Sequence, residues 1–406
     1  MQKLVIAAGL AFTACHNPNY CPGNPDNACD EGNPVDAKPD TMEALDCVAM
    51  GCSGGQVCDT SSHACVACTD SNPGTCAGTS PVCHQEACAA CVANAECTTS
   101  DACMPDGSCA DMNDVAYVKT TGGVDNATCD KDHPCATIGA GFAAKSIVRA
   151  SGDFTGSLTY TTGSRTLLGD RNGNTLSTIS GAPTLLSVGP SATITVRDFA
   201  FNNATGIAIT NAGTTTLDRC EINNGANIGI QGTAGILTLS RSRVFSNDGG
   251  GIDLQNAMFA ISNSFVIENG SSSNIFGGIS IYRSGGSLDF STIARNIGTS
   301  GTMGVVCTQT SALTFDSNIV YMNSNAQVEG TSCTYKYSNV FGTGTAPTGT
   351  GDMSVDVMFA GAHDYHLATG SVLKDLADPA SSLADDIDGD ARPQGNVRDI
   401  GADELL

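Results

Sequence analysis

A unit of about 22 residues repeats seven times between residues 194 and 340, and this repeat limits the folds open to the chain. Each copy begins with a triplet that alternates apolar, polar and apolar residues, as expected for a strand with one buried face. The triplets are 194–196, 215–217, 237–239, 259–261, 288–290, 313–315 and 335–337. A second short strand follows in five copies, at 207–209, 228–230, 252–254, 279–281 and 305–306.

Asparagines and glycines separate the strands of each copy, and both residue types tolerate left-handed backbone, which indicates corners. No copy has room for a helix, so strands that recur once per copy must lie parallel and bury their inner side chains coil on coil. The pattern predicts an all-β, right-handed parallel β-helix, since parallel crossovers are almost always right-handed. An antiparallel β-sandwich is the alternative, but a sandwich does not keep asparagine corners in register with its strands.

Two copies are longer than the others, with 29 residues between Ile261 and Phe290 and 25 between Phe290 and Phe315. The extra residues, including 270–276 and 298–303, should form loops that bulge from one face. Loops on a rigid solenoid commonly carry binding sites, so we expect any groove near the enlarged coils 262–310.

The first 14 residues have the charged start and short apolar run of an export signal, and they are too short to span a membrane. Residues 12–15 read Phe-Thr-Ala-Cys and resemble a bacterial lipobox, which implies cleavage before Cys15 and lipid attachment to its thiol. Residue 16 is His and not Asp, which by analogy with other lipoproteins indicates the outer membrane or cell surface. An ordinary secretory signal with Cys15 in a disulfide is the alternative.

The 20 cysteines of an exported chain indicate disulfides. Residues 15–46 resemble a tether, whereas 47–110 hold 12 cysteines and few large apolar residues, so bridges must hold that module together. Its Cys-x2-Cys pairs also fit zinc, but export and the many further cysteines favour disulfides. Outside this module we expect the pairs Cys129–Cys135 and Cys307–Cys333, with Cys220 left as a buried free thiol.

Two further segments resemble exported β-helix proteins. Residues 115–150 include Tyr117-Val118, Gly122-Gly123 and Pro134-Cys135-Ala136-Thr137-Ile138, and residues 388–393 read Asp-Gly-Asp-Ala-Arg-Pro. With the repeats, these matches cover essentially all of 115–406 and resemble the pectate-lyase-like right-handed β-helix superfamily, in its lipoprotein branch. The resemblance implies an N-terminal cap at 115–150 with a short helix, and a C-terminal cap at 385–406. It does not imply one activity, because this fold hosts lyases, hydrolases, epimerases and adhesins.

Enzymes of this superfamily act on polysaccharides, the lyases with calcium and a basic residue and the hydrolases with paired carboxylates. The repeats contain no adjacent Asp-Asp, and residues 134–362 contain no histidine. The catalytic candidates are therefore Asp253 and Asp289, expected to point outward from their strands, and Arg283 and Arg295, with Glu268 and Asp316 in a wider set. Arg219 and Arg241 align in register, and we interpret this row as structural.

Asp386, Asp388 and Asp390 are spaced like a calcium loop, but the glutamate of an EF-hand is missing. The resemblance instead places this stretch in the C-terminal cap, where Asp388, Arg392 and Asp399 would bond the chain to the last coil. We therefore keep both interpretations, with calcium as the one possible cofactor.

The net charge of −23 argues against a nucleic-acid partner. We expect a monomeric, lipid-anchored cell-surface protein whose β-helix is a non-enzymatic module that binds a polysaccharide or a surface protein. The alternative is a polysaccharide-degrading enzyme, a calcium-dependent lyase in preference to a hydrolase.

Overall fold

The computed structural model describes residues 47–406 except 70, 73, 174, 275 and 300. The expected export signal 1–14, the lipidation site Cys15 and the tether 15–46 lie outside the described residues. The chain divides into two compact units, Met1–Val66 and Ala67–Leu406. In the described parts of both units, no helix is long and apolar enough to cross a membrane.

The described part of the first unit is a small disulfide-linked motif. It contains α1 (Cys47–Met50) and an antiparallel pair formed by β1 (Val57–Asp59) and β2 (Ala64–Val66). Two disulfides, Cys47–Cys58 and Cys52–Cys65, hold it together, as its scarcity of large apolar residues requires.

The second unit begins with the rest of the cysteine-rich region. Here β3 (Val82–His84) pairs with β4 (Ala87–Ala89), and two 3-10 helices follow, η1 (Asn94–Glu96) and η2 (Met112–Asp114). The cysteines of this stretch form the disulfides Cys68–Cys83, Cys76–Cys88, Cys91–Cys103 and Cys97–Cys109. The Cys-x2-Cys sulfurs are therefore engaged in disulfides, which removes the zinc alternative.

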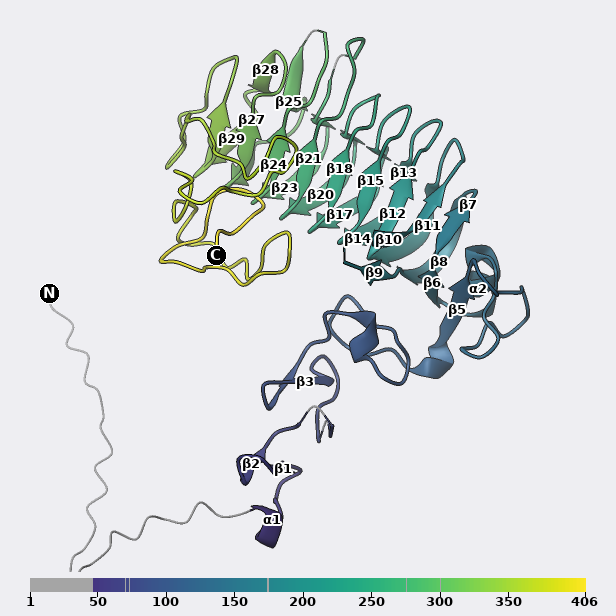
Figure 1. Cartoon of the computed structure of the whole chain (residues 1–406). Coiled ribbons are helices and arrows are strands. Elements are labelled where there is room, and N and C mark those ends of the chain that lie inside the picture. The colour runs from purple at the N-terminus through teal and green to yellow at the C-terminus, as the bar shows by residue number, and fades with distance from the viewer. Residues whose placement is uncertain (1–46, 70, 73, 174, 275, 300) are drawn as a thin grey trace, which may run out of the picture. The chain divides into compact units, whose positions relative to one another are not determined.

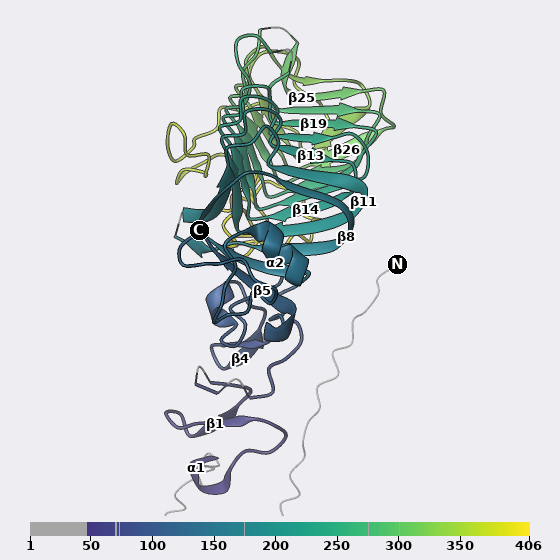
Figure 2. The same cartoon turned by 90° about the vertical axis from the view of Figure 1, so that its right-hand side faces the viewer.

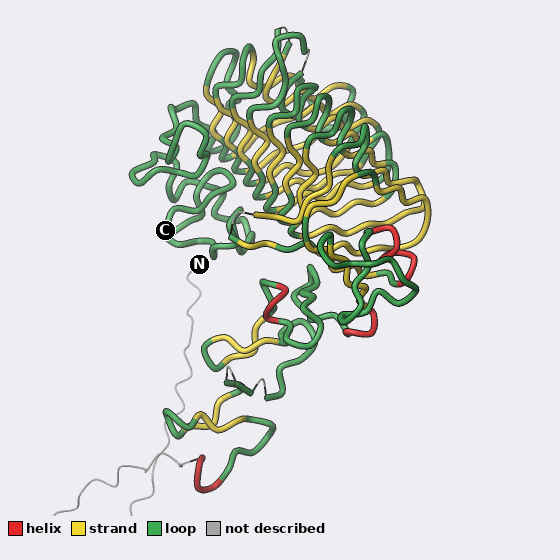
Figure 3. Tube along the Cα trace, turned by 45° about the vertical axis from the view of Figure 1, so that its right-hand side comes forward, coloured by secondary structure: helices red, strands yellow, loops and turns green. Residues whose placement is uncertain are grey.

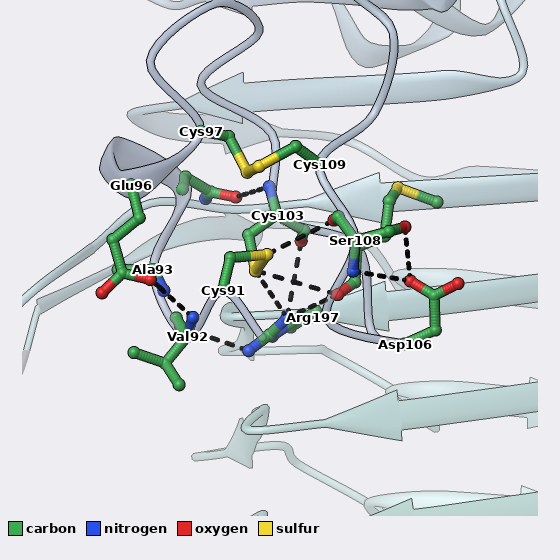
Figure 4. Close-up of a disulfide and its surroundings, with 12 residues drawn as sticks. Cys91, Val92, Ala93, Glu96, Cys97, Cys103, Asp106, Ser108, Cys109 and Arg197 are labelled. Carbon is green, nitrogen blue, oxygen red and sulfur yellow. Dashed lines mark hydrogen bonds between the residues drawn. A yellow bond between two sulfur atoms is a disulfide. The ribbon is translucent and has the colours of Figure 1, made fainter. Parts of the chain in front are cut away.

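Arg197 ties this stretch to the first coils (Figure 4). Its side chain is 5% exposed and donates to the carbonyls of Met104 (2.8 Å) and Val92 (3.2 Å), which flank the disulfide-linked turns. Asn94 adds a bond to the carbonyl of Gly169 at 2.7 Å. These polar contacts join residues 67–110 to the solenoid, in agreement with the unit boundary after Val66.

The solenoid is a parallel β-helix with three strands per coil, stacked in three rows that we call the first, second and third faces (Figures 1 and 3). The first face contains β14 (Thr214–Asp218), β17 (Ile236–Ser240), β20 (Met258–Ser262), β23 (Gly285–Asp289), β26 (Leu313–Asp316) and β29 (Cys333–Lys336). The second contains β13 (Ile209–Asn211), β16 (Ile230–Gly232), β19 (Ile252–Gln255), β22 (Ile279–Tyr282), β25 (Thr302–Thr308) and β28 (Ala326–Glu329). The third contains β12 (Phe199–Asn202), β15 (Glu221–Asn223), β18 (Arg243–Phe245), β21 (Phe265–Ile267), β24 (Thr292–Ala294), β27 (Ile319–Tyr321) and β30 (Asn339–Phe341).

The entry to the solenoid is formed by β5 (Val115–Lys119), β6 (Ile147–Ser151), β7 (Asp153–Thr155), β8 (Leu158–Leu168), β9 (Arg171–Asn172), β10 (Thr175–Ser180) and β11 (Leu186–Arg197). The long strand β11 pairs with both β13 and β14, so it joins the first and second faces into one sheet. The expected cap helix is present as α2 (Ile138–Ala144), begins at the N-cap Thr137, and lies at this end of the solenoid beside β5 and β8 (Figure 2).

The repeat alignment made from the sequence is wrong by two residues in one enlarged coil and in the last copy, where Phe315 pairs with Tyr335 and Tyr337 lies at the following corner. Ile261 pairs with Leu288, so the inward residue of β23 is Leu288, and Phe290 lies at the following corner. The same shift moves Arg295 from an inward position to the corner after β24, since Val266 pairs with Ile293. Both enlarged coils consequently span 27 residues between equivalent positions.

Each coil turns the corner between its first-face strand and its third-face strand at one residue with left-handed backbone, with φ between 45° and 56°. These residues are Asp198, Arg219, Arg241, Asn263, Phe290, Ser317 and Tyr337. The later asparagines form a buried ladder inside the coils. The side-chain Nδ2 of each donates to the side-chain oxygen of the next residue in the row, which runs Asn247, Asn269, Asn296, Asn323 and Gln327. The ladder satisfies backbone groups that the tight turns would otherwise leave unpaired.

The expected disulfides Cys129–Cys135 and Cys307–Cys333 are both formed, and Cys220 is a buried free thiol. Cys307 belongs to β25 and Cys333 to β29, so the second bridge links one coil to the next. Burial raises the pKa of the Cys220 thiol far above its usual range, which keeps it protonated and inert.

The segment after β30, residues 342–406, contains no helix or strand in its described residues, and it folds back over the third face (Figure 1). The strands β21, β24 and β27 are buried on both sides, because Val357, Tyr365, Leu367 and Ile400 pack on their outer side. The expected C-terminal cap therefore has a different place: it lies along the coils from Arg241 to Lys336, to which Asp385 and Asp378 are ion-paired.

Candidate functional site

A cavity of about 520 Å³ lies between the third face and the returning C-terminal segment. Three arginines and one glutamate reach it from the coils: Arg171, Arg241, Arg243 and Glu221, which is in register with Arg243 on the neighbouring strand. His363 and His366 reach it from the C-terminal segment, together with two of its acidic residues. The protein carries only 18 Lys and Arg against 41 Asp and Glu, so this is a local concentration of cationic groups on an acidic chain.

Arg243, at the start of β18, is the least compensated of these cations. Its guanidinium carbon lies 5.3 Å from the centre of the Phe245 ring and 5.9 Å from that of Phe265, within the range of cation–π contacts. Among the described residues its side chain forms no ion pair, and its buried Nε has no hydrogen-bond partner. Glu221, Asp364 and Asp388 lie in the same cavity but form no ion pair with Arg243, so its guanidinium, held by two rings, can accept an anionic ligand.

The other two arginines are already paired. Arg171 donates to Asp198 at 2.9 Å, and Arg241 donates to both oxygens of Asp218 and to Asp385 at 2.7 Å. These bonds join charged residues at the corners of neighbouring coils, so Arg241 has the structural role expected from the sequence. The same bonds fix the position of both arginines at the cavity.

His366 stands between two carboxylates at the cavity wall. Its Nδ1 bonds to Asp364, and its Nε2 lies 3.0 Å from an oxygen of Asp388. The hydrogen bond to Asp388, with a further contribution from Asp364, raises the pKa of His366 to about 9 and lowers that of Asp388. Asp403 lies close by, and its burial raises the pKa of its carboxyl to about 6.

A second polar cluster ties the C-terminal segment to the corner after β21. Glu268 accepts from the Tyr365 hydroxyl at 2.6 Å and pairs with His363 at 2.6 Å. Arg295, from the equivalent corner of the next coil, donates to the carbonyl of Ala362 at 3.1 Å. Arg295 therefore helps to hold the segment that closes the cavity, but it does not line the cavity.

The four catalytic candidates from the sequence are distributed over all three faces. Asp253 lies on β19 of the second face and accepts from Gln255 at 2.7 Å, while Arg283 follows β22 and stacks on Tyr282. Asp289 ends β23 of the first face, and Arg295 follows β24 of the third. No hydrogen bond or ion pair between the described residues joins any two of these four, so the structure does not gather them into one groove.

Asp289 has a different neighbour, because it pairs in register with Asp316 of the next coil. Burial raises the pKa of both carboxyl groups, and Lys336 lies 3.0 Å from Asp316 and 2.6 Å from Asp378. Two carboxylates in adjacent coils resemble the pairs used by hydrolases, but here the lysine binds one of them to the C-terminal segment.

The calcium interpretation of Asp386, Asp388 and Asp390 does not agree with the geometry. Asp386 is buried, and its carboxylate accepts the backbone N–H groups of Asp388 (3.0 Å), Asp390 (2.8 Å) and Glu404 (3.0 Å). Asp388 turns to His366 instead. Asp386 therefore organises its own loop with the lone pairs that a cation would need.

Sequence reasoning missed the residues of the cavity. It searched the repeats for histidines, whereas His363 and His366 lie after them and reach the coils only because the segment folds back. A signal was present: Phe265-Val266-Ile267 and Ile319-Val320-Tyr321 are uninterrupted apolar runs, which indicate strands covered on both sides.

A cavity of about 580 Å³ also lies in the disulfide-linked stretch, against Val82, His84 and Glu96. Its other lining groups are mainly hydroxyls, half-cystines and small apolar side chains, and its one ion pair is His84–Glu96 at 3.6 Å. It gathers less charge than the cavity on the third face, so we give the latter priority as a functional site.

Comparison with known proteins agrees with this fold. Residues 159–293 match the family described as the right-handed beta helix region. A similar solved structure is the crystal structure of pectate lyase Pel9A, with 12% sequence identity, a TM-score of 0.45, and coverage of 72% of this chain and 96% of that chain. No curated protein matches the chain. The family match at residues 159–293 and the parallel strand rows confirm the expected right-handed parallel β-helix, and this fold is compatible with binding proteins and with enzymes.

Proposed function

We propose that this protein is an exported, lipid-anchored binding module that holds an acidic polysaccharide in the cavity over the third face. The observation that carries the proposal is Arg243, a cationic side chain that forms no ion pair among the described residues and has an unpaired Nε at the wall of a cavity of about 520 Å³. The carboxylate of a uronate sugar has the charge and the planar shape that a guanidinium recognises.

The surroundings of Arg243 support a binding role in preference to catalysis. Phe245 and Phe265 fix its guanidinium, and Arg171 and Arg241 add positive potential while remaining paired with the coils. The candidate acids of the coils, Asp253 and Asp289, lie on other faces, so they cannot work together with this arginine.

The location follows from the sequence and from the disulfides. The lipobox-like residues 12–15 support an anchor on Cys15, and eight disulfides among the described residues fit an oxidising compartment outside the cytoplasm. We propose the bacterial outer membrane or cell surface, where a tether at 15–46 would give the module reach toward its polysaccharide.

The test is calorimetric titration of the full chain, made with its disulfides intact, with acidic and neutral oligosaccharides of equal length. We expect binding of the acidic series only, and Arg243→Ala should weaken it at least ~10-fold, since a hydrogen bond to a charged group contributes about 1.5–3 kcal/mol. Arg283→Ala is the matched control, because this arginine also stacks on an aromatic ring but follows β22 on the second face. Equal weakening by both variants, or no binding of any acidic oligosaccharide, would contradict the proposal.

The second candidate function is a polysaccharide lyase, and it is favoured by the family's fold and by the outward carboxylates of the coils. The same oligosaccharides, incubated with calcium or with chelator, separate the two. Calcium-dependent absorbance of unsaturated uronates would replace the binding role with a lyase activity, and new reducing ends without that absorbance would indicate a hydrolase.

A further inference from the structure

Three segments that are distant in the chain bring a histidine and two aspartates together at the wall of the cavity. His366, Asp388 and Asp403 each offer one ligand atom, and these atoms all lie within 4.8 Å of one another. His366 comes from the stretch before Leu367, Asp388 from the loop closed by the bridge between Asp385 and Ala391, and Asp403 from the C-terminal stretch. We infer that these residues form a site for one divalent transition-metal ion, of which zinc fits best.

The distances require only small movements for an ion to bind. Zinc bonds to nitrogen and oxygen are about 2.0–2.2 Å long, so tetrahedral ligand atoms lie about 3.3–3.6 Å apart. The Nε2 of His366 is already 3.0 Å from the Asp388 oxygen, and the third ligand atom lies within the 4.8 Å limit. The ion would take the place of the proton on Nε2, which leaves on binding.

The imidazole is oriented as it is in protein metal sites. Asp364 bonds to Nδ1 and so directs Nε2 toward the two other aspartates, an arrangement in which a carboxylate fixes the tautomer of a ligating histidine. The ring of Phe265 contacts the imidazole edge-on at 5.3 Å between centroids and limits its rotation. Asp386 fixes the loop by accepting the backbone N–H of Asp388.

Asp403 is the second, independent indication of a ligand. It is 7% exposed, and among the described residues its carboxylate accepts one hydrogen bond, from the backbone N–H of Leu367 at 2.6 Å. A buried carboxylate offers about four lone-pair directions, so hydrogen bonds among the described residues leave most of this acceptor capacity unused, within 4.8 Å of the other ligand atoms. A nearby cation stabilises a buried carboxylate that has so few partners: His366 supplies one positive charge to the cluster, and a divalent ion would supply two.

The chemistry of the donors selects the ion. One imidazole and two carboxylates balance the charge of a divalent cation, and an imidazole ligand favours zinc over calcium or magnesium, which prefer oxygen alone. His366 and Asp388 also line the cavity, so a fourth coordination position would be open toward it. The inference does not rest on the proposed polysaccharide binding, and the ion would bind whether or not a glycan does.

The test is calorimetric titration of the oxidised full chain with Zn²⁺ alone, after removal of metal with chelator. We expect one equivalent to bind, and His366→Ala and Asp388→Asn each to weaken binding at least ~10-fold, the lower bound for loss of groups around a metal site. Both side chains are partly exposed, so these variants should fold, which circular dichroism would check. The control is His363→Ala, which removes an exposed histidine that pairs with Glu268 and is not a member of the cluster, and this variant should bind zinc like the parent protein.

X-ray absorption at the zinc edge gives a second readout, in which one imidazole and oxygen ligands are expected. Absence of zinc binding in the parent chain, unchanged affinity in both ligand variants, or sulfur ligation at the zinc edge would overturn the inference. The zinc titration contains no glycan, so a negative result would not bear on the proposed polysaccharide binding. A negative result with the oligosaccharides would likewise not bear on the zinc site.

Discussion

The coils and the C-terminal segment of the same unit are held together in different ways. In the coils, each residue contacts its equivalent one turn away, as in the stack of Val196, Leu217, Leu239, Ile261 and Leu288. In residues 342–406, buried carboxylates accept backbone N–H groups: Asp386 accepts three, and Asp399 accepts those of Asp375 and Leu405.

The difference shows how a regular scaffold acquires a specific site. A coil that repeats its contacts presents the same kind of surface at each turn, and it has no reason to gather unlike groups at one place. The irregular segment carries histidines and acids to chosen positions of the third face, and both proposed sites lie where the two regions meet.

The largest effect should come from Arg392→Met, which removes the central cation of the C-terminal segment. The Arg392 side chain is fully buried over the Phe290 ring, pairs with Glu404 and donates to the carbonyls of Asp399 and Gly401. Loss of one member of a buried pair costs about 3–5 kcal/mol. Hydrogen exchange should show lost protection in 342–406 while the coils keep theirs.

The control for this substitution is Arg398→Met, a half-buried arginine in the same segment that donates to the carbonyl of Leu383. Its protection pattern should stay close to that of the parent chain. If Arg392→Met instead unfolded the coils and the segment together, the two regions would be one cooperative unit and the comparison would fail.

A smaller but global effect is expected from Asn269→Ala in the coils. The Asn269 amide accepts two hydrogen bonds from Asn247 and donates to the carbonyl of Val244 and to Asn296. Its loss leaves buried groups unpaired on both neighbouring coils, at a cost of about 2–3 kcal/mol. Guanidinium unfolding followed by circular dichroism measures the loss, with the exposed Asn227→Ala as the control that should change stability little.

The smallest effect should be a gain, from Asp289→Asn. Burial raises the pKa of Asp289 above its unfolded value, so its ionised form destabilises the fold, and this cost is present at pH 7 and disappears as the pH falls toward 4. Asparagine removes the charge beside Asp316, and we expect a gain below about 1 kcal/mol at pH 7 and none near pH 4. Unfolding at both pH values measures it.

Asp253→Asn is the matched control, because the Asp253 carboxylate accepts from Gln255 and does not face an acidic residue of the next coil. A loss of stability in Asp289→Asn at pH 7 would show that the charge is needed where it lies, and it would return Asp289 to the list of functional candidates.

The coils could be predicted from the sequence because their contacts are periodic. The triplets at 194–196, 215–217, 237–239, 259–261 and 313–315 all lie in strands of the first face or in β11, which leads into it. The errors at 288–290 and 335–337 arose because Phe290 and Tyr337 carry large aromatic rings although they occupy corners, where the other coils have polar residues. Residues 288–290 read apolar, polar, apolar, so hydrophobicity alone cannot decide whether Leu288 or Phe290 is the last inward residue of the strand.

The residues of the cavity and of the metal-binding cluster could not be predicted in the same way, because no local sequence pattern indicates where an irregular segment packs back on the coils. His366, Asp388 and Asp403 are separated by long stretches of chain and have no common spacing. Only the packing of Tyr365 and Ile400 on the third face determines that they meet, and such packing depends on the shape of the assembled coils.

The hydrogen bonds of the asparagine ladder all run from one coil to the next coil along the chain, and they end at Gln327. Each coil obtains the acceptor for its buried amide from the coil that leaves the ribosome after it, so during synthesis the newest turn is always one hydrogen-bond partner short. Gln327 ends this dependence, because its longer side chain reaches back four residues to supply Asn323 from within the same coil. Gln327 thus determines where the asparagine ladder can end. Whole coils could be added or removed before Gln327 while the first asparagine and the final glutamine of the ladder keep their roles.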